Sequence, residues 1–166
     1  PHYRVCMDIE MDSLLALRQQ FNADHARNPD NTKVSVNDFI IKACATALTE
    51  QPALNIQFVD NEIHQYQQAD ISVVMAVEGG LSTPIVHNAN NKIVQNIAKE
   101  TKDLATRAQK GTLKMDEILG GSFSISNLGM FGVDQFDAII NPPQCAILAV
   151  GAARIQPVVK KGSVQT

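Results

Sequence analysis

The sequence has no tryptophan, and aromatic residues make up only 5% of its 166 positions. It also lacks clusters of lysine and arginine, and its formal net charge is -3. Because proteins that bind phosphate backbones need a basic surface, we predict that nucleic acid is not a partner. No stretch approaches the roughly 18 uninterrupted apolar residues of a membrane-spanning helix, so the sequence predicts no membrane partner either.

Cysteine is scarce as well, with three residues in the chain. They are far apart and form no C-x-x-C pair, so the sequence predicts neither a disulfide framework nor a cysteine-bound zinc ion and favours a reducing compartment. Each has apolar neighbours, and free cysteine is often buried, so we expect all of them to pack in the core. They are Cys6, Cys44 and Cys145.

Self-contained catalytic motifs are missing too. The chain has no H-E-x-x-H metal motif and no G-x-S-x-G nucleophile turn, and its glycines fit neither a dinucleotide-binding nor a P-loop fingerprint. The four histidines are not at metal-ligand spacing, so we predict no metal site and interpret each one as an isolated surface residue. They are His2, His25, His64 and His87.

The chain does have enough length for one domain with a buried core. Strand and helix patterns follow one another without strict βαβ alternation. This predicts an α+β two-layer sandwich, in which a mixed, mainly antiparallel sheet has helices packed on one face. We expect helices at about residues 12–26, 38–50 and 93–109, and strands at about 3–10, 55–59, 63–65, 70–77, 122–126 and 144–153.

One strand pattern is unusual. The stretch SFSISNLGMFG begins as a strand in which apolar residues alternate with three serines, and it ends as a loop with two glycines. Hydroxyl groups that face a cavity can stabilise a developing oxyanion, but alternating polar residues are also common on a solvated sheet face. Ser126 differs from Ser122 and Ser124 because the strand gives way to the loop directly after it. Functional sites are often built at such positions.

Two further polar residues need an explanation. Arg18 falls within the apolar stripe of the first predicted helix, where a charge must reach solvent or find a partner. Ser35 precedes the second predicted helix, and Asp38 follows it by three residues, a spacing that predicts a capped helix start.

A longer segment, SFSISNLGMFGVDQFDAIINPPQCAILAVG, closely resembles the signature of the dihydrolipoyl acyltransferase catalytic core. The similarity is greatest to the acetyltransferase components of pyruvate dehydrogenase complexes. The segments PHYRVCMDIEMDSLLALRQQFN, VSVNDFIIKACATAL and ADISVVMAVEGGLSTPIV resemble other parts of the same domain, in the same order. The resemblance therefore covers essentially the whole chain.

This resemblance implies a chloramphenicol-acetyltransferase-like fold. It also implies transfer of an acetyl group between a lipoyl-lysine arm and coenzyme A, without a metal. The implied assembly is a homotrimer with active sites between subunits, built into cores of roughly 24 or roughly 60 subunits. Lipoyl domains and the decarboxylase and dihydrolipoamide dehydrogenase components would be its partners, in the bacterial cytoplasm or the mitochondrial matrix. Complexes for pyruvate, 2-oxoglutarate and acetoin use similar cores, so the acyl group stays open.

The resemblance also assigns roles to residues that stood out above. Ser126 matches the family serine that hydrogen-bonds the oxyanion of the tetrahedral intermediate, and the loop after it would help to form the channel wall. Arg18 and Ser35 match positions that contact coenzyme A. A guanidinium group suits the phosphates of that ligand, and Ser35 can cap its helix at the same time.

Further coenzyme contacts are implied at other positions. Asn127 and Gly151 match two of them, and Gln109 matches a third if a gap is placed near Gly111. Ala76 stands where acyltransferases of the branched-chain type have an acidic coenzyme contact, which fits the acetyl-type subgroup.

The family's His-x-x-x-Asp-Gly motif is absent from these 166 residues. Its histidine takes the proton from the attacking thiol, a step that suits a neutral imidazole. We therefore expect residues 1–166 to be the acyltransferase core domain without the C-terminal part that carries this motif, and to be inactive alone. The main hypothesis is a piece of a true acetyltransferase core. The alternatives are a non-catalytic structural core subunit of the same complex and a separate small-molecule acetyltransferase of the same fold.

Overall fold

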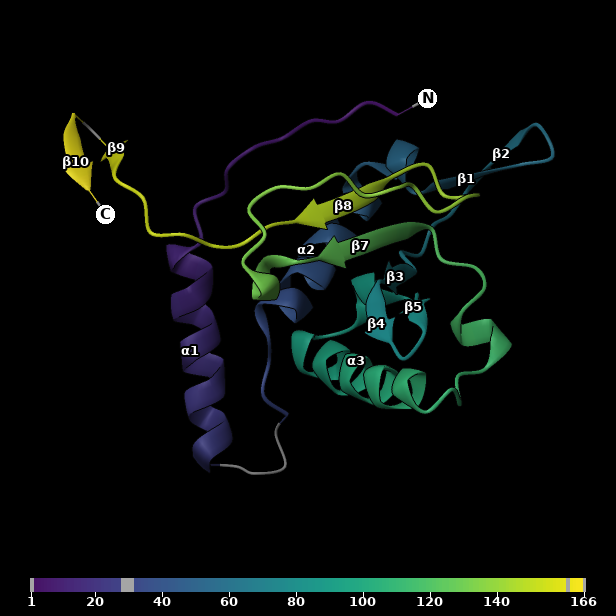
Figure 1. Cartoon of the computed structure of the whole chain (residues 1–166), viewed down its shortest axis with the longest axis horizontal. Coiled ribbons are helices and arrows are strands. Elements are labelled where there is room, and N and C mark those ends of the chain that lie inside the picture. The colour runs from purple at the N-terminus through teal and green to yellow at the C-terminus, as the bar shows by residue number, and fades with distance from the viewer. Residues whose placement is uncertain (1, 28–31, 161, 166) are drawn as a thin grey trace.

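A computed structural model describes residues 2–27, 32–160 and 162–165 (Figure 1). The α-helices of these residues are α1 (Asp12–Arg27), α2 (Val36–Glu50) and α3 (Val94–Gln109). The strands are β1 (Ile56–Val59), β2 (Glu62–Gln65), β3 (Ile71–Val73), β4 (Met75–Val77), β5 (Gly80–Ser82), β6 (Ile85–Val86), β7 (Phe123–Asn127), β8 (Ile147–Val150), β9 (Val158–Lys160) and β10 (Ser163–Gln165).

The central sheet has four strands in the order β6-β3-β7-β8. β3 pairs antiparallel with β6 but parallel with β7, and β7 pairs parallel with β8. The remaining pairs in the described residues are antiparallel: β1 with β2, β4 with β5, and β9 with β10. The sheets are therefore mixed and mainly antiparallel, as predicted, although the strands at the centre of the fold run parallel and end at one edge.

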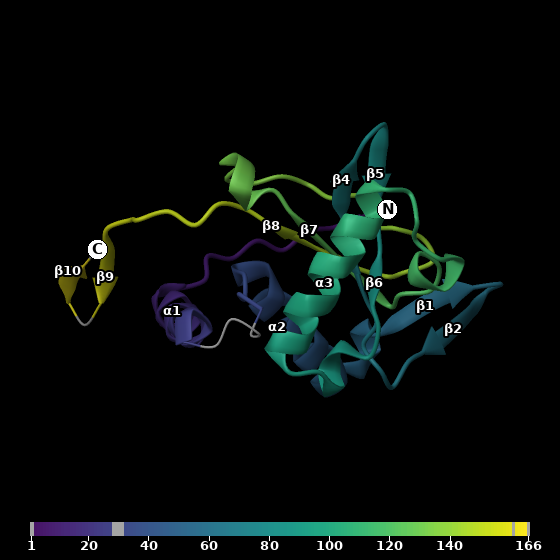
Figure 2. The same cartoon turned by 90° about the horizontal axis from the view of Figure 1, so that it is seen from below.

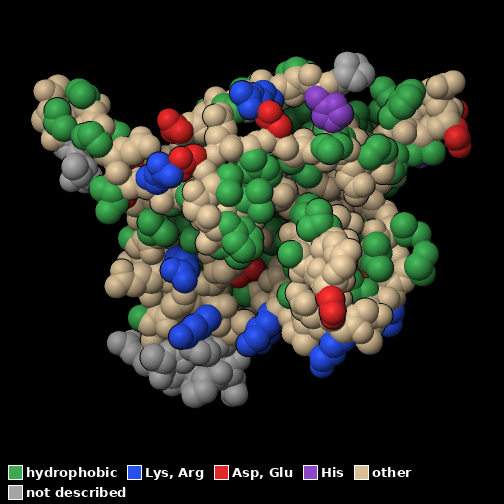
Figure 3. Space-filling model, in the orientation of Figure 1, with side chains coloured by type: hydrophobic (Ala, Val, Ile, Leu, Met, Phe, Trp, Pro, Cys, Tyr) green, Lys and Arg blue, Asp and Glu red, His purple; other side chains and the backbone are tan. Residues whose placement is uncertain are grey.

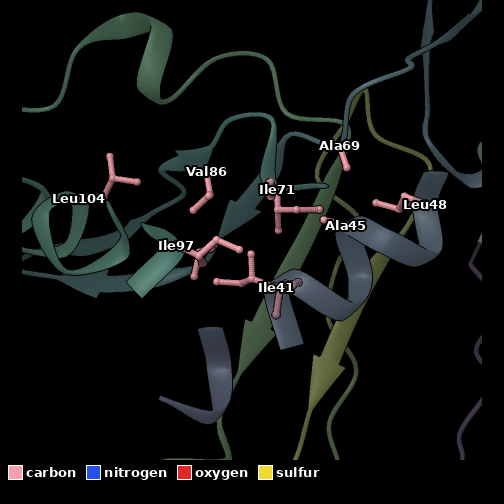
Figure 4. Packing of buried hydrophobic residues seen from close by; sticks show 11 residues of the cluster. Ile41, Ala45, Leu48, Ala69, Ile71, Val86, Ile97 and Leu104 are labelled. Atoms are coloured by element: carbon pink, nitrogen blue, oxygen red, sulfur yellow. The ribbon is translucent and has the colours of Figure 1, made fainter. Parts of the chain in front are cut away.

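Helices α2 and α3 cover one face of this sheet, which confirms the predicted two-layer α+β arrangement. They lie side by side in Figure 2, and Figure 4 shows their buried side chains meeting those of the strands. Burying each large aliphatic side chain contributes about 1.5–3 kcal/mol, so this layer supplies most of the hydrophobic stabilisation. The layer includes Ile41, Ala45 and Leu48 of α2, Ile97 and Leu104 of α3, and Ile71, Val73, Val86 and Ile125 of the sheet.

Helix α1 stands to one side of this layer in both views (Figures 1 and 2). It contacts α2 through Phe21 and Phe39, whose rings meet edge to face with centroids 5.7 Å apart. This contact brings α1 beside the beginning of α2.

The opposite face of the sheet carries a buried polar network. Gln144 accepts a hydrogen bond from the Ser124 hydroxyl, and its side-chain amide donates to Ser72 Oγ and to the Gly121 carbonyl, each at 3.1 Å. Gly121 has a φ of +60°, and a Cβ atom there would lie 2.3 Å from Ser72 Oγ, so only glycine fits. The network joins β3, β7 and the segment before β8.

The predicted strand at 3–10 is wrong. This segment is extended but belongs to no sheet of the described residues. It lies along the loop before β8 through side-chain bonds, such as the 2.7 Å ion pair between Arg4 and Asp137. Its alternating apolar residues, which suggested a strand, point to solvent instead: Tyr3, Val5, Met7 and Ile9 are all more than two-thirds exposed.

Two other expectations need correction. The apolar run at 70–77 is not one strand, because β3 ends at Val73 and β4 leaves the central sheet to pair with β5. Cys6 is exposed rather than buried, and Cys145 is only partly buried. Cys44 fits the expectation best, because burial raises the pKa of its thiol to about 11.

The paired strands outside the central sheet project from the body and expose apolar side chains. Figure 3 shows hydrophobic side chains at the surface on both sides of the view. The exposed apolar residues of these hairpins are Phe58 and Ile63 of β1 and β2, and Val159 and Val164 of β9 and β10. In the part of the chain that the structure describes, no helix has the length and apolar character needed to cross a membrane.

Candidate active site

Ser126 lies at the carboxyl end of β7, where the sheet supports this strand on one side only. β8 continues beside it, with Ala149 opposite Ser126, whereas the last pair of β3 with β7 is Val73 with Ile125. The Ser126 side chain is half-buried, and its hydroxyl has no hydrogen-bond partner among the described residues. The arrowheads of β7 and β8 point the same way in Figure 1, toward α1. A polar group left unpaired at such an edge is available to a ligand.

The hydroxyl groups of the other two serines form hydrogen bonds within the protein. The Ser122 hydroxyl is 3.3 Å from the Asp70 backbone nitrogen and 3.4 Å from the Asp70 carbonyl, and both serines are buried. Ser124 donates to Gln144. The serine-lined face is therefore neither a solvated surface nor a row of equivalent donors, because only Ser126 keeps an unpaired hydroxyl.

Asn127 and Gly151 lie at the same end of the sheet as Ser126, because Asn127 pairs with Val150 and Gly151 comes next in the chain. The Asn127 carbonyl oxygen accepts a hydrogen bond from the Gly129 backbone N–H at 2.9 Å, and its amide donates to Asn37 Oδ1 at 3.1 Å. Gly151 follows β8, and a Cβ atom there would lie 1.9 Å from the Asp134 carbonyl oxygen. The loop between β7 and β8 therefore passes very close to the end of β8.

Arg18 and Ser35 come together near the beginning of α2. Arg18 Nε donates to the Val34 carbonyl at 3.2 Å, which supplies the partner that its place in the apolar stripe required. Ser35 caps α2 as predicted: its hydroxyl accepts from the Asp38 N–H at 3.2 Å, and Asp38 Oδ2 accepts from the Ser35 N–H at 2.7 Å. The terminal nitrogens of Arg18 have no partner among the described residues.

Because Asn127 bonds to Asn37 in the first turn of α2, the structure joins this helix start to the end of β7. Asn37 was missed by sequence reasoning, since a polar residue in the first turn of a helix is common and carries no signal. The first turn of α2 thus carries the Asp38 carboxylate, which accepts the Ser35 N–H, and the Arg18 guanidinium lies next to this helix start through its bond to the Val34 carbonyl.

Gln109 lies apart from this group, at the end of α3. Its side-chain amide donates to the Ala76 carbonyl of β4 at 2.7 Å. Gln109 and Ala76 were both matched to coenzyme-contact positions, and the structure brings them into direct contact. β4 continues the chain just beyond the carboxyl end of β3, so this pair lies at the same edge of the sheet as Ser126.

His87 is not an isolated surface histidine, contrary to the sequence interpretation. Its Nδ1 is 3.1 Å from Asp70 Oδ2, and its Nε2 is 3.0 Å from the Asp116 carbonyl. Partial burial lowers the pKa of His87, but these two hydrogen bonds together with the negative charges of Asp70 and Glu100 outweigh it, so the pKa is raised. The His25 side chain lies outside the described residues.

The His87–Asp70 pair cannot serve Ser126 within this chain. Asp70 bonds to Ser122, four residues before Ser126 on β7. At about 3.3 Å per residue, the pair is roughly 13 Å from the Ser126 end of the strand. Proton transfer needs hydrogen-bond contact, directly or through one water molecule.

A pocket of about 400 Å³ lies elsewhere, near the end of α2 and the base of the β1–β2 hairpin. Its lining includes Leu48 and Tyr66 but none of the candidate residues. Leu48 is roughly 17 Å along the helix from Asn37, at about 1.5 Å per residue. We therefore assign this pocket no part in the site. No group of three or more histidine, cysteine, aspartate or glutamate residues in the described chain is arranged to hold a metal ion.

The family model for 2-oxoacid dehydrogenases acyltransferase (catalytic domain) matches residues 1–166. The chain belongs to this family. Among curated relatives, the dihydrolipoyllysine-residue acetyltransferase component of the pyruvate dehydrogenase complex of Zymomonas mobilis is 47% identical over 157 residues. That match covers 95% of this chain but only 35% of the relative, so the chain spans about a third of the curated protein's length. The curated relatives include bacterial and mitochondrial proteins.

Solved structures of acyltransferase cores have the same fold. The dihydrolipoamide acetyltransferase of Azotobacter vinelandii is 30% identical with a TM-score of 0.88, and the match covers 94% of this chain and 64% of that one. The cubic core of a pyruvate dehydrogenase multienzyme complex matches with the same TM-score, identity and coverage. These likenesses confirm the expected chloramphenicol-acetyltransferase-like fold of this acyltransferase domain.

Proposed function

We propose that this acyltransferase domain transfers an acetyl group between dihydrolipoyl-lysine and coenzyme A in the core of a pyruvate dehydrogenase-type complex. The observation that carries the proposal is the unpaired hydroxyl of Ser126 at the edge of the sheet where β7 and β8 end. The named activity of the curated relatives supports it, as does the work on the Azotobacter enzyme, which concerns a serine, a histidine and an asparagine in its catalytic mechanism.

In this reaction the thiol of coenzyme A attacks the carbonyl carbon of the S-acetyldihydrolipoyl thioester. A carbon–sulfur bond forms, and the carbonyl oxygen becomes an oxyanion to which the Ser126 hydroxyl donates. Collapse of the intermediate breaks the bond to the dihydrolipoyl sulfur, which leaves as a thiol after taking up a proton. A fixed donor of this kind contributes about 2.7–4 kcal/mol of transition-state stabilisation.

Arg18, Ser35, Asn127, Gly151 and Gln109 are the proposed contacts for coenzyme A. The terminal nitrogens of the Arg18 guanidinium, to which none of the described residues bonds, suit a phosphate group. Lys33 is exposed two residues before Ser35 and adds a second positive charge near the start of α2. Within the described chain, the Ser35 hydroxyl already holds Asp38, so we assign it a contact that is secondary to its capping role.

The base that activates the thiol has no candidate among the described residues, since the His87–Asp70 pair is at the other end of β7. We propose that it comes from a His-x-x-x-Asp-Gly motif outside these 166 residues, presented by a neighbouring subunit of a homotrimer. The trimers would build a cubic or dodecahedral core that receives lipoyl domains and binds the decarboxylase and dihydrolipoamide dehydrogenase components, in the bacterial cytoplasm or the mitochondrial matrix.

One observation favours a second candidate function. Because no described histidine reaches Ser126, a non-catalytic structural subunit of the same core is the alternative. Such a subunit would keep the fold and the assembly surfaces without turnover.

The test is an acetyl-transfer assay on the protein expressed from its full-length gene. Acetyl-CoA and dihydrolipoamide are supplied, and both free coenzyme A and S-acetyldihydrolipoamide are measured, with succinyl-CoA in a parallel reaction. We expect turnover with acetyl-CoA that exceeds turnover with succinyl-CoA. A core that assembles normally but transfers no acyl group would contradict the enzyme and support the structural subunit. Transfer to a small amine or alcohol but not to dihydrolipoamide would contradict both.

A further inference from the structure

The orientation of the Asn127 side-chain amide is fixed by its neighbours. The Gly129 backbone N–H can only donate a hydrogen bond, so the Asn127 atom that faces it at 2.9 Å must be the carbonyl oxygen. The NH₂ group of Asn127 therefore points to Asn37, 3.1 Å away, and Asn37 must present its oxygen. The Gly129 N–H, which can only donate, thus fixes which atom donates and which accepts in both hydrogen bonds.

The Asn127–Asn37 bond and the Ser126 hydroxyl lie on opposite faces of the strand end. Side chains alternate along β7, so Asn127 points with Ile125 toward the helix layer, whereas Ser126 points with Ser124 to the other face. A bond from Asn127 to α2 therefore holds the backbone that carries Ser126 without contacting the Ser126 hydroxyl.

On the β3 side, the last bond to β7 is the one from the Val74 N–H to the Ile125 carbonyl at 2.9 Å. Beyond Ile125, β3 no longer pairs with β7, and only β8 continues as a neighbouring strand. The turn after Asn127 is held by the Gly129 N–H bond and by the Leu128 N–H bond to the Val150 carbonyl at 3.0 Å. Asn37 is thus the contact from α2 that fixes the strand end relative to the helix start where Arg18 and Ser35 lie.

We infer that Asn37 is a positioning residue: through Asn127 it fixes the Ser126 hydroxyl relative to the start of α2. The inference rests on the proposed function, because it assigns this contact the task of aligning the oxyanion donor with the coenzyme site. Asn37 touches neither thioester nor thiol in this scheme. It acts by holding the strand end, and small displacements of an aligned group are costly in rate.

The test uses the full-length protein and exchanges the hydrogen-bonding capacity at both positions. Asn37→Ala removes the acceptor, whereas Asn37→Asp keeps an oxygen for the Asn127 NH₂ group. In an Asn127→Asp background we expect the reverse order of kcat for the two Asn37 variants. There Asn37 can rotate its amide and donate to the new carboxylate, but Asp at both positions places two carboxylates against each other. Asn96, an exposed residue in the first turn of α3, provides matched control variants, Asn96→Ala and Asn96→Asp.

We expect Asn37→Ala to lower kcat about tenfold while KM for coenzyme A changes by less than about threefold. Asn37→Asp should recover most of kcat, with a raised KM because its charge repels the anionic coenzyme. In the Asn127→Asp background, Asn37→Asp should instead be the slower variant, and lowering the pH should partly restore it as the paired carboxylates share a proton. A kcat unaffected by Asn37→Ala, or the same order of variants in both backgrounds, would overturn the inference.

A second readout separates this inference from the proposed function. Hydrogen exchange over residues 126–132 is measured by mass spectrometry on the same proteins. Asn37→Ala should speed exchange in this segment, and Asn96→Ala should not. If the wild-type protein transfers no acetyl group but exchange responds as stated, the proposed function fails and the positioning contact stands. If exchange does not respond, the contact does not hold the strand end and the inference fails.

Discussion

Ser124 and Ser126 point to the same face of the same strand, yet their surroundings differ completely. Ser124 is fully buried and gives its hydrogen to Gln144, in a network that also satisfies Ser72 and the Gly121 carbonyl. Ser126 is half-buried, lies past the last pair with β3, and has no partner in the described chain. The amino half of β7 is thus a satisfied polar core, and its carboxyl end is an open donor.

Within one alternating pattern, Ser124 therefore has a structural role and Ser126 is free for a functional one. A buried hydroxyl must be paired, because leaving it unpaired costs about 1–3 kcal/mol. An unpaired donor is tolerated only where water or a ligand can reach it. The position along the strand therefore decides which serine is available for chemistry.

The largest loss of stability should come from a substitution that fills the space between the end of β8 and the loop before it. In Gly151→Ala the new Cβ would lie 1.9 Å from the Asp134 carbonyl, so the loop before β8 must move. We expect a loss of about 3 kcal/mol, with reduced acetyl transfer. Thermal unfolding of the full-length protein measures it, and Gly80→Ala is the control, since no atom lies within 4 Å of a Cβ there. Equal unfolding temperatures for the two variants would show that the close approach is absent.

The next effect should come from the amino half of β7. Gln144→Leu would leave Ser124 and Ser72 without this partner, whereas the Gly121 carbonyl keeps its 2.7 Å bond from the Gln57 amide, so we expect destabilisation of roughly 2 kcal/mol. Unfolding in urea measures it, with the exposed Gln19→Leu as a matched control. If Gln144→Leu were as stable as the control, the network would not carry the structural role assigned to it.

At the start of α2, the Ser35 hydroxyl combines both kinds of role, because it caps the helix and is also a proposed coenzyme contact. Ser35→Ala removes the helix cap and should cost about 1 kcal/mol, whereas Ser35→Thr keeps the hydroxyl and should cost less. KM for coenzyme A is measured on both. A KM for coenzyme A that is raised in the alanine variant and normal in the threonine variant supports the contact, and an alanine variant with the wild-type KM contradicts it.

The smallest effect concerns His87, beside the amino end of β7. Both ring nitrogens face acceptors, Asp70 and the Asp116 carbonyl, and Glu100 adds a further negative charge. Since the folded-state pKa of His87 is raised, its contribution is complete below the unfolded pKa of about 6.5 and is lost as pH rises through the folded value. Because the side chain is 45% exposed, the gain should stay below about 1 kcal/mol.

His87→Gln checks this pH dependence. The stability difference between wild type and variant, measured by denaturation from pH 5.5 to 8.5, should shrink as pH rises. A difference that grows with pH would contradict the assigned hydrogen bonds.

Much of the fold could be predicted because its signals are local. The Ser35 cap with Asp38 and the helix at α1 depend on residues close in the sequence and are confirmed, although Leu15 and Leu17 of the predicted apolar stripe are exposed. The strand at 3–10 failed because alternation shows only that one face differs from the other. It does not provide a neighbouring strand to pair with, and this segment lies against a loop.

The candidate site could be predicted in part. The position of Ser126 at a strand end was visible in the sequence, but its lack of a partner depends on where β3 stops and where Gln144 lies. Neither Gln144 nor Asn37 is marked by any local pattern, because each works through contacts with residues distant in the sequence. The His87–Asp70 pair was missed for the same reason.

The most direct test of the account compares Ser126→Ala with Ser124→Ala in the full-length protein, with kcat for acetyl transfer and the unfolding temperature measured on each. We predict that Ser126→Ala lowers kcat about 100- to 1000-fold and leaves the unfolding temperature unchanged. Ser124→Ala should lower the unfolding temperature and leave kcat of the folded protein within about threefold, because it removes a buried structural bond and leaves the Ser126 hydroxyl in place. A Ser126→Ala protein with normal kcat, or a folded Ser124→Ala protein that loses activity as severely, would contradict the assignment of Ser126 as the donor to the oxyanion.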